Sequence, residues 1–525
     1  MLKTARRDFL IRSGVAALAS ASGVRFAFAA LEDNRPELRI AVQKNPETQE
    51  PVDIPSNVAF RNNYSIHETL LKLDSTGQFS VQPNLATSWR WIDEKTLEVK
   101  LRKGVIFHDG REMTAEDVAF SFGPERLTDP KSPGYPAYLI NFSSIDHVKA
   151  VDPQTVRFVT KFQDPILLQR LAGYAAVVIS KDAWIKLGGN WASWKQKPVG
   201  AGPYMVAESI TNDHLALVSN DRYFRGKPPA RKVTFRVVPE VSARIAGLLA
   251  GDYDIATDLP PDQLKVVNKA PGYKIVGGPV PNDRILFLDK YNPALKDPRV
   301  RQALSLAIDR QAIVDSIWNG QTVVPNGLQF KQYGPVYLKD RPRYKYDPAR
   351  AAQLLKEAGY KGEKISIRSQ NNYYTAENPV SEAVVAMWQA VGVNAKLEFV
   401  PGDGLFAESG RSTGNWSSTA VIADPYVSFY SISFGKSAIM GTRHIWVNDE
   451  FDALGAKLEK AVDPKDRARI FSDMLDIIEW NDPGVIVLHQ NAVFYGISSK
   501  VNWKPQPAFS MDLGPGSLSF ASVTK

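Results

Sequence analysis

The sequence predicts a mixed α/β protein with several lobes. The chain has 525 residues, and at roughly 150 residues per domain this length favours two to four compact units. Hydrophobic residues make up 44% and charged residues 23%, so each unit can bury an ordinary globular core. Segments with strand periodicity alternate with segments of helical periodicity, which is typical of helices layered on sheets.

The first clear strand and helix lie near residue 100. Leu97, Val99 and Leu101 alternate with polar residues, as in a half-buried strand. Thr114 is followed three residues later by Asp117, which resembles the acidic form of a capping box and predicts a helix start. Further along, residues 233–237 read as a second strand, residues 242–251 as a helix that ends at glycine, and residues 254–256 as a short strand.

Three more helices are predicted to begin at Asp-Pro pairs. Aspartate accepts hydrogen bonds from the free N–H groups of a first helical turn, and the fixed φ of proline suits the first helical position. The pairs are Asp297-Pro298, Asp347-Pro348 and Asp463-Pro464. Apolar residues at helical spacing follow each pair, and the first two stripes end at Gly320 and Gly359, so each helix should face a core.

The N-terminus predicts export. Residues 1–29 combine a basic start, a short apolar run at 14–21 and the small-x-small sequence Ala27-Phe28-Ala29, which together form a signal peptide. The pair Arg6-Arg7 resembles a twin-arginine address. A membrane anchor is the alternative, but a span needs about 20 apolar residues. We therefore expect a periplasmic protein exported by the twin-arginine route.

The composition excludes several classes of function. The chain has no cysteine, which removes disulfides, thiolate catalysis and Cys-ligated metals, and also the acylated cysteine of lipoproteins. The signal segment holds five basic residues and one acid, so it carries +4 of the total charge of +8 and leaves +4 for the mature chain. The charge of the mature chain is small, and its sequence has no run of Lys or Arg residues. Nucleic acid is therefore not an expected partner.

Enzymatic motifs are absent or out of context in the sequence. Residues 410–414 fit G-x-S-x-G, but that elbow needs a strand before the serine and a helix after it, and a strand-like segment follows here. The six histidines form no H-E-x-x-H or other close pair, so no metal site or cofactor is expected. An exported hydrolase of small conjugates remains the alternative function, supported only by this serine loop.

Four stretches together resemble the family-5 (peptide/nickel type) extracytoplasmic solute-binding proteins. They occur in the family's order at residues 85–122, 198–206, 297–320 and 346–360. The first contains LRKGVIFHDG followed by TAEDV, which is similar to the family's signature block. The second, PVGAGPYMV, has Ala201 where the family usually has threonine. The resemblance extends from about residue 37 to the C-terminus.

The resemblance implies a fold of the periplasmic-binding-protein-like type II (cluster C), with two hinged lobes and an extra domain. Lobe I would comprise residues 30–75, 198–283 and 487–525, the extra domain residues 76–197, and lobe II residues 284–486. The implied protein is a monomeric receptor without a cofactor, not an enzyme. It would close over a small ligand by hinge motion and deliver the ligand to an ABC permease.

Family analogy also places residues at the ligand. Tyr64, Tyr373, Trp416 and Tyr426 lie in stretches that face the cleft in the family. Residues 420–430 align with the segment whose aspartate pairs with the α-amino group in peptide receptors. Aligned on Asp424-Pro425, Val421 takes that position, which disfavours ordinary peptides because a buried ammonium would lack its counter-ion. With a shifted alignment, Asp424 itself would be the amine partner.

Three polar segments complete the candidate site. Arg443 and His444 lie in a stretch that often enters the cleft in relatives, where arginine would favour a carboxylate or phosphate; a solvated loop is the alternative. His489 and Gln490 follow an apolar strand at 485–488, with a satisfied sheet edge as the alternative. Asn371, Asn372 and Tyr373 follow a strand at 365–368, where ligands meet α/β lobes.

These segments predict a polar and anionic ligand. The missing amine partner and Arg443 favour a sugar conjugate, a phosphorylated sugar or an opine-like compound over an ordinary peptide.

Overall fold

The computed structural model describes residues 33–521, apart from residues 54–55, 75–78, 343, 372 and 438. Residues from Arg35 onward form one compact unit. The predicted signal segment, residues 1–29, lies outside the described residues. Among the helices that are described, none is long and apolar enough to cross a membrane.

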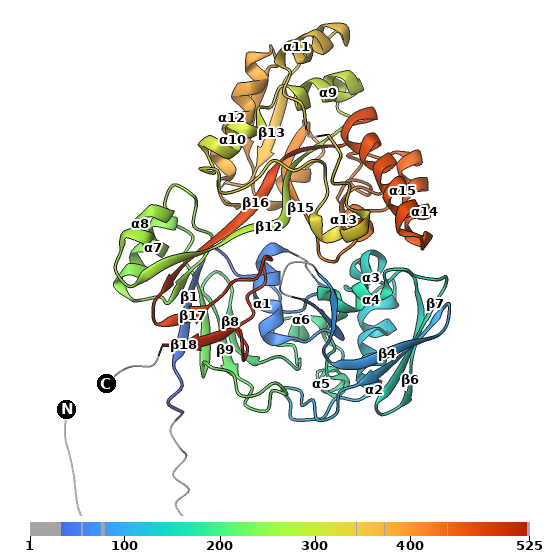
Figure 1. The fold of residues 1–525 in the computed structure, drawn as a ribbon, viewed down its shortest axis with the longest axis vertical. Helices are drawn as coiled ribbons and strands as arrows, with labels where there is room; N and C mark the ends of the chain where they lie inside the picture. Colours follow the sequence, from blue (N-terminus) through green and yellow to red (C-terminus); the bar gives the residue numbers. More distant parts are fainter. Residues whose placement is uncertain are drawn as a thin grey trace, which may run out of the picture. The chain divides into compact units, whose positions relative to one another are not determined.

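The largest sheet has ten strands (Figure 1), and two long antiparallel strands, β12 (Tyr273–Leu288) and β16 (Val485–Ser498), lie in its middle. The strand order is β14-β13-β15-β12-β16-β11-β1-β10-β9-β8. The remaining strands are β1 (Glu37–Val42), β8 (Tyr204–Ile210), β9 (His214–Ser219), β10 (Lys232–Val237), β11 (Ile255–Ala256), β13 (Ile365–Ser369), β14 (Ala395–Phe399) and β15 (Thr413–Thr419).

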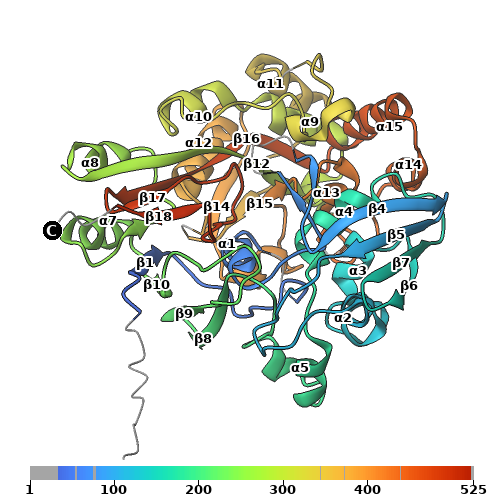
Figure 2. The same ribbon diagram turned by 60° about the horizontal axis from the view of Figure 1, so that its bottom comes forward.

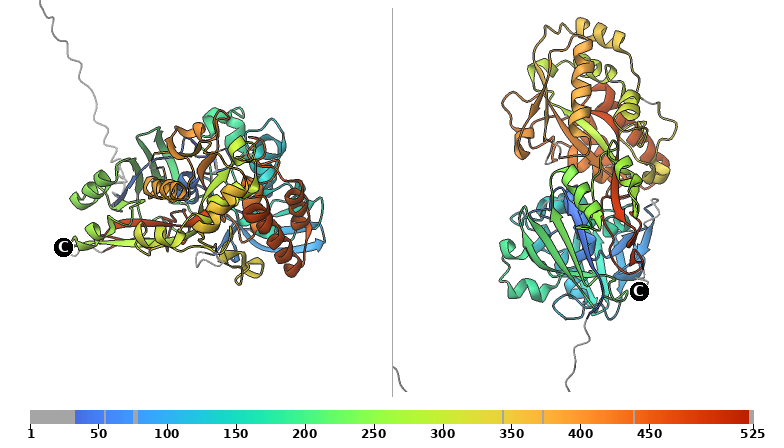
Figure 3. Two further views of the ribbon diagram at one scale, coloured as in Figure 1. Left: turned by 90° about the horizontal axis from the view of Figure 1, so that it is seen from above. Right: turned by 90° about the vertical axis from the view of Figure 1, so that its left-hand side faces the viewer.

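Helices bury their apolar sides against this sheet in two large cores. The first core involves α7 (Val241–Ala250), α8 (Leu264–Lys269), α9 (Pro298–Leu306), α10 (Arg310–Ser316), α11 (Pro348–Glu357) and α12 (Glu377–Ala390). The second involves α13 (Pro425–Ile432), α14 (Asp449–Lys460) and α15 (Pro464–Asp476). Figure 3 (right) shows the yellow and orange helices at one end and the blue and green elements at the other.

A separate four-stranded antiparallel sheet has the order β4-β5-β7-β6 and its own core. Its strands are β4 (Ala86–Asp93), β5 (Thr96–Leu101), β6 (Ile145–Asp152) and β7 (Thr155–Thr160). Around it lie α2 (Ala115–Ser121), α3 (Tyr135–Asn141), α4 (Leu167–Ala172), α5 (Lys181–Lys186) and α6 (Trp191–Trp194). Leu97 and Val99 are fully buried, as the alternation predicts.

The remaining elements are short. Helix α1 (Asn57–Ile66) lies near the centre of the folded unit in Figures 1 and 2. Two hairpin-like pairs are β2 (Leu71–Leu73) with β3 (Val81–Pro83) and β17 (Val501–Trp503) with β18 (Leu518–Phe520). Short 3₁₀ segments lie at Tyr174–Ala176, Pro293–Leu295, Lys331–Val336 and Gly402–Phe406, and π-helical turns at Pro124–Thr128 and Ile477–Asn481.

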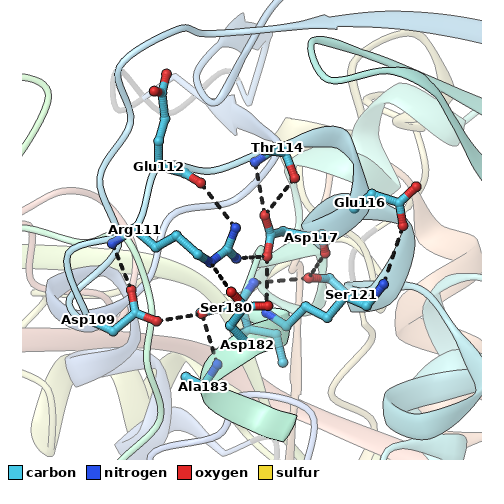
Figure 4. Close-up of polar contacts among 12 residues, drawn as sticks. Asp109, Arg111, Glu112, Thr114, Glu116, Asp117, Ser121, Ser180, Asp182 and Ala183 are labelled. Atoms are coloured by element: carbon cyan, nitrogen blue, oxygen red, sulfur yellow. Dashed lines mark hydrogen bonds and ion pairs between the residues drawn. The ribbon is translucent and has the colours of Figure 1, made fainter. Parts of the chain in front are cut away.

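The predicted capping box is present, and it belongs to a structural network (Figure 4). The Asp117 carboxylate accepts hydrogen bonds from Thr114 N at 2.9 Å and from Lys181 N at 3.1 Å, and it pairs with Arg111. Ser180 caps α5 and donates to Asp109 at 2.8 Å. The HDG turn and the TAED helix start therefore hold α2 and α5 together, and their polar groups are used within the fold.

Some predicted boundaries were wrong. The stripe after Asp297-Pro298 predicts one helix as far as Gly320, but the chain forms α9 and α10, and Asp309 caps the second by accepting from Ala312 N at 2.9 Å. Both helices bury residues in the same core, so the apolar spacing continues across the break. The strand predicted at 485–488 continues to Ser498. The helix predicted at 242–251 is present as Val241–Ala250, and Gly251 ends it as predicted.

Candidate functional site

Three adjoining cavities lie against α1, with volumes of about 810, 440 and 880 Å³ that include space open to solvent. We name them the apolar, arginine and tryptophan cavities, in that order. The apolar and tryptophan cavities share Phe60 and Tyr174, and the arginine and tryptophan cavities share Asn57 and Tyr373. Because they share lining residues, the three cavities adjoin, and we treat them together as one candidate site.

Helix α1 supplies one wall of every cavity. Asn57, Phe60, Arg61 and Tyr64 line the cavities at intervals of three or four residues, which places them on one face of the helix. Ser56 begins the helix, because its hydroxyl accepts a hydrogen bond from Ala59 N at 3.1 Å. The local sequence therefore fixes both the helix and the face that meets the cavities.

The other walls come from segments far apart in the sequence. Strands β12 and β16 contribute their central residues, and Trp416 to Val421 contribute the end of β15 and the turn after it. The loop before α12 contributes Tyr373 to Thr375, and residues 506–512 of the C-terminal segment line the apolar cavity. A solute in this site would contact most parts of the fold.

Two arginines line the arginine cavity, and the first is Arg61. Its Nη2 lies 2.6 Å from the carboxylate of Asp258, which also accepts from Thr257 Oγ1 at 2.6 Å. Arg61 is 4% exposed, and its Nη1 is buried without an acceptor among the residues that the structure describes. A buried donor without a partner costs free energy, so this N–H group is suited to donate a hydrogen bond to a ligand oxygen.

The second is Arg284 on β12. Its Nη1 donates to the Trp416 carbonyl at 3.0 Å and contacts Asn415 Oδ1 at 3.4 Å, while its guanidinium stacks over the Tyr374 ring at 3.4 Å. Burial lowers the pKa of this guanidinium, but arginine stays charged in proteins. Within the described part of the chain, no carboxylate lies at ion-pair distance from Arg284.

The backbone beside the arginine cavity is held in unusual conformations. Asp258 and Ala376 both have a φ of 56°, in the left-handed region that non-glycine residues seldom adopt. Arg244 donates to the Thr257 carbonyl at 3.1 Å, and Glu377 accepts from Tyr374 N at 3.0 Å. These bonds hold Asp258 against Arg61 and Tyr374 against Arg284, and such conformations often occur at functional sites.

Three of the residues predicted from the sequence line the cavities. Tyr64 lies in the apolar cavity, Trp416 in the tryptophan cavity, and Tyr373 in both the arginine and tryptophan cavities. Asn371 is exposed and accepts from Asn378 Nδ2 at 2.7 Å, and Asn372 lies outside the described residues. The ligand-binding role of these residues stays a prediction.

Tyr426 lies in the second core and Asp424 is buried beside it, and neither lines any of the three described cavities. Asp424 caps α13, where its carboxylate accepts from Tyr426 N at 2.9 Å and pairs with buried Arg467. Tyr426 is buried with Arg170 over its ring at 5.2 Å. Asp424-Pro425 is thus a further Asp-Pro helix start, like the three predicted from the sequence, and this capping role explains why an aspartate stands at position 424.

The remaining predicted residues also lie away from the three cavities. Arg443 packs over the Phe406 ring at 4.3 Å, and exposed His444 contacts the Tyr291 ring at 5.3 Å. His489 is inside β16, accepts from Trp318 Nε1 at 3.3 Å, and has its pKa lowered to about 3 by burial. Gln490 donates to the Val280 carbonyl at 2.8 Å.

Sequence reasoning missed Arg61, Asp258, Arg284 and Tyr374, which form the arginine cavity. The available signal was the position of Arg284 directly before the apolar run Ile285–Leu288. A charge in such a place needs a specific reason. Ser412 of the G-x-S-x-G segment is buried, accepts from Ser366 N at 2.7 Å and donates to the Ser366 carbonyl at 3.0 Å, next to a strand and not a helix.

Comparisons with known proteins agree with this architecture. The model of the bacterial extracellular solute-binding proteins, family 5 (middle region), matches residues 80–437. The chain is 26% identical over 458 residues to the oligopeptide-binding protein AppA of Bacillus subtilis (strain 168), covering 81% of each chain. It is 26% identical over 506 residues to the glutathione-binding protein GsiB of Shigella flexneri serotype 5b, covering 94% of this chain and 95% of that protein.

Solved structures share the fold. DppA from Helicobacter pylori, in complex with the peptide STSA, superposes with a TM-score of 0.81 at 23% identity, over 93% of this chain and 98% of that one. AgaA from A. tumefacien R10, in complex with agropinic acid, superposes with a TM-score of 0.77 at 22% identity, over 90% and 96%. The predicted α/β fold with the cluster C architecture is thus confirmed.

Proposed function

The chain belongs to the bacterial extracellular solute-binding proteins of family 5, and we propose that it captures a small polar solute around α1 and delivers it to an ABC permease of the inner membrane. Proteins of this family are non-catalytic receptors that act outside the cytoplasm. The proposal therefore concerns which solute is bound, where it is bound and how it is released.

The three adjoining cavities at α1 carry this proposal. Its walls combine aromatic rings with a few polar side chains, the composition of sites that take small molecules out of water. Residues 30–75, 198–283 and 487–525 are proposed as lobe I, residues 76–197 as the extra domain, and residues 284–486 as lobe II. Lobe I and lobe II residues then face each other across all three cavities.

Hinge closure is proposed at β12 and β16. Their pairing shifts register between Pro279 and Asp283 and again between Arg284 and Ile285, next to the proposed lobe boundary. Such irregularities bend strands and suit a hinge. Gln43 Nε2 donates to the Tyr373 carbonyl at 3.1 Å across the two proposed lobes, a contact that opening would break.

We propose an anionic solute, such as a sugar conjugate or an opine-like compound, over an ordinary peptide. Val421, which aligns with the amine-pairing position of peptide receptors, lines both the apolar and the tryptophan cavities. A peptide ammonium there would meet a valine side chain. Relatives with this fold bind chemically different solutes, including a peptide and agropinic acid, so the fold alone does not choose.

The test is to purify the exported protein gently and identify the solute that it holds by native mass spectrometry. Calorimetric titration would then compare agropinic acid, glutathione and unmodified di- to pentapeptides. We expect one equivalent of an anionic compound, released chemically unchanged on unfolding. Micromolar binding of plain peptides would contradict the solute class, and turnover of a conjugate would support the hydrolase alternative.

The export route is also a proposal. We expect a monomer in the periplasm that is not lipidated and that leaves the cytoplasm through the twin-arginine pathway. Replacement of Arg6 and Arg7 by lysine should leave the precursor in the cytoplasm, measured by fractionation. Unchanged export of the double variant would indicate a different route.

A further inference from the structure

We propose that Arg61 and Arg284 form a binding site for a carboxylate group of the solute in the arginine cavity. This inference rests on the proposed function and adds to it the position and the charge of the group that is bound. The observations that carry it are the charge balance of the cavity, the unpaired nitrogen of Arg61 and the fixed orientation of Arg284.

The charged residues lining the arginine cavity do not balance. They are Arg61, Asp258 and Arg284, which together carry one net positive charge. Glu377 does not line the cavity. Its carboxylate attracts the Arg284 guanidinium, but it already accepts from Ser369 Oγ at 2.6 Å and from Tyr374 N. A buried net charge is costly unless a counter-ion is present, so a solute anion would relieve an existing cost.

Both arginines are positioned before a solute arrives. Arg61 is fixed by its ion pair with Asp258, and this pairing leaves Nη1 without an acceptor in the described structure. Arg284 is fixed between the Trp416 carbonyl and the Tyr374 ring. Ordering two long side chains in advance reduces the entropy that binding loses.

The charge balance favours a carboxylate over a phosphate dianion. One carboxylate neutralises the single net charge, and its two oxygens accept well from guanidinium N–H groups. A dianion would leave one negative charge buried beside Asp258. We therefore assign a monoanionic carboxylate to this cavity, and the uncharged remainder of the solute to the tryptophan cavity, which shares Asn57 and Tyr373 with it.

The site also links ligand charge to closure. Arg61 lies on α1 in proposed lobe I, and Arg284 is the first residue of proposed lobe II. A carboxylate that contacts both would attract each lobe to the same group. A neutral analogue of the same shape lacks this attraction, so it should bind weakly and favour the closed state less.

The experiment uses acetate as the carboxylate probe and acetamide as its neutral counterpart. Captured solute is first removed by unfolding and refolding the exported protein. Broadening of the methyl NMR signal then gives a dissociation constant for each probe. For Arg284→Gln we expect acetate affinity to fall at least about tenfold, because a charge-assisted hydrogen bond is lost, and Arg61→Gln should act in the same direction.

Arg102→Gln is the matched control. Arg102 also packs against an aromatic ring, Phe224 at 5.3 Å, and donates to a backbone carbonyl, Asn84 O at 3.0 Å, but it lines none of the three cavities. Its replacement should leave acetate binding unchanged. Arg284→Lys keeps the charge without the planar fork, so we expect an intermediate affinity, and it replaces Arg284→Gln if that variant does not fold.

Two results would overturn the proposal: acetate binding to Arg284→Gln within twofold of the original protein, or acetamide binding as tightly as acetate. The proposed function fails separately. If mass spectrometry finds a captured solute but acetate does not bind, the carboxylate site is wrong and the receptor stands. If acetate binds but no solute is ever captured, the site stands and the receptor proposal is wrong.

Discussion

Buried arginines are treated differently in two regions of this protein. In the core around α13 and α15, Arg467 pairs with Asp424 and also donates to the carbonyls of Leu458 at 2.6 Å and Ala461 at 2.9 Å. In the arginine cavity, Arg61 keeps an unpaired nitrogen and Arg284 has no carboxylate partner among the described residues. A buried arginine with a carboxylate partner stabilises the folded core, whereas a buried arginine without one is suited to bind an anionic ligand.

The largest expected effect comes from breaking the balanced pair. Asp424→Ala removes the partner of buried Arg467 and the cap of α13. We expect a loss of about 3–5 kcal/mol in the free energy of unfolding, measured by urea denaturation. Acetate binding by the folded fraction should stay unchanged, and a stability loss below about 1 kcal/mol would contradict the assigned structural role.

The next effect concerns Asp283, the neighbour of Arg284 in β12. Asp283 is fully buried, neither oxygen has a described partner, and burial, with a smaller effect of Glu479, raises its pKa well above 3.8. The folded state then holds a proton that the unfolded state releases, so stability falls as the pH rises from the unfolded pKa to the folded pKa.

Asp283→Asn should therefore raise the free energy of unfolding by about 1–3 kcal/mol above the folded pKa, because the buried charge is removed. The difference should shrink towards zero below pH 3.8, where both forms are neutral. Urea midpoints at several pH values measure this difference. An equal difference at every pH would show that the carboxyl group does not titrate in this range.

A smaller effect is expected at Tyr374, which stacks on Arg284 at 3.4 Å. Tyr374→Leu keeps an apolar contact and removes the ring, so acetate should bind more weakly by about 1 kcal/mol, close to fivefold. The NMR titration with acetate measures it, and Tyr291→Leu, which changes an exposed tyrosine outside the cavities, is the control. Unchanged affinity would mean that the stack does not orient Arg284.

The smallest effect is expected at the hairpin of β8 and β9, at the edge of the ten-stranded sheet. His214 contacts Asp213 at 2.8 Å and Glu208 at 3.0 Å, and these carboxylates raise its pKa. The stabilisation is complete below pH 6.5 and is lost as the pH rises through the raised value. His214→Gln should cost at most about 1 kcal/mol at low pH and nothing at high pH, measured by thermal unfolding.

Local sequence predicted much of the fold, because caps and periodicity act over a few residues. The Asp-Pro starts at 297, 347 and 463 and the capping box at Thr114 are all present. The break between α9 and α10 was missed because both helices meet the same core, so the apolar spacing does not change. Strand β16 was predicted too short because polar His489 and Gln490 read as its end.

The candidate site was predicted less completely. Tyr64, Tyr373 and Trp416 were found because family analogy and aromatic type both pointed to them. Asp424 and His489 were predicted because of their chemistry, but in the structure Asp424 accepts a hydrogen bond from Arg467 and His489 accepts one from Trp318, both inside the protein. Whether a polar side chain is used internally depends on residues tens or hundreds of positions away.

The sequence by itself determined the α/β class, the family and the starts of several helices, since these follow from short patterns of polarity and from blocks that resemble the family's motifs. Only the tertiary structure decided that Arg61, Asp258 and Arg284 line one cavity. Residues 197 positions apart form that ion pair. These charges come together because α1, the segment after β11 and strand β12 meet in the folded chain, which no local pattern encodes.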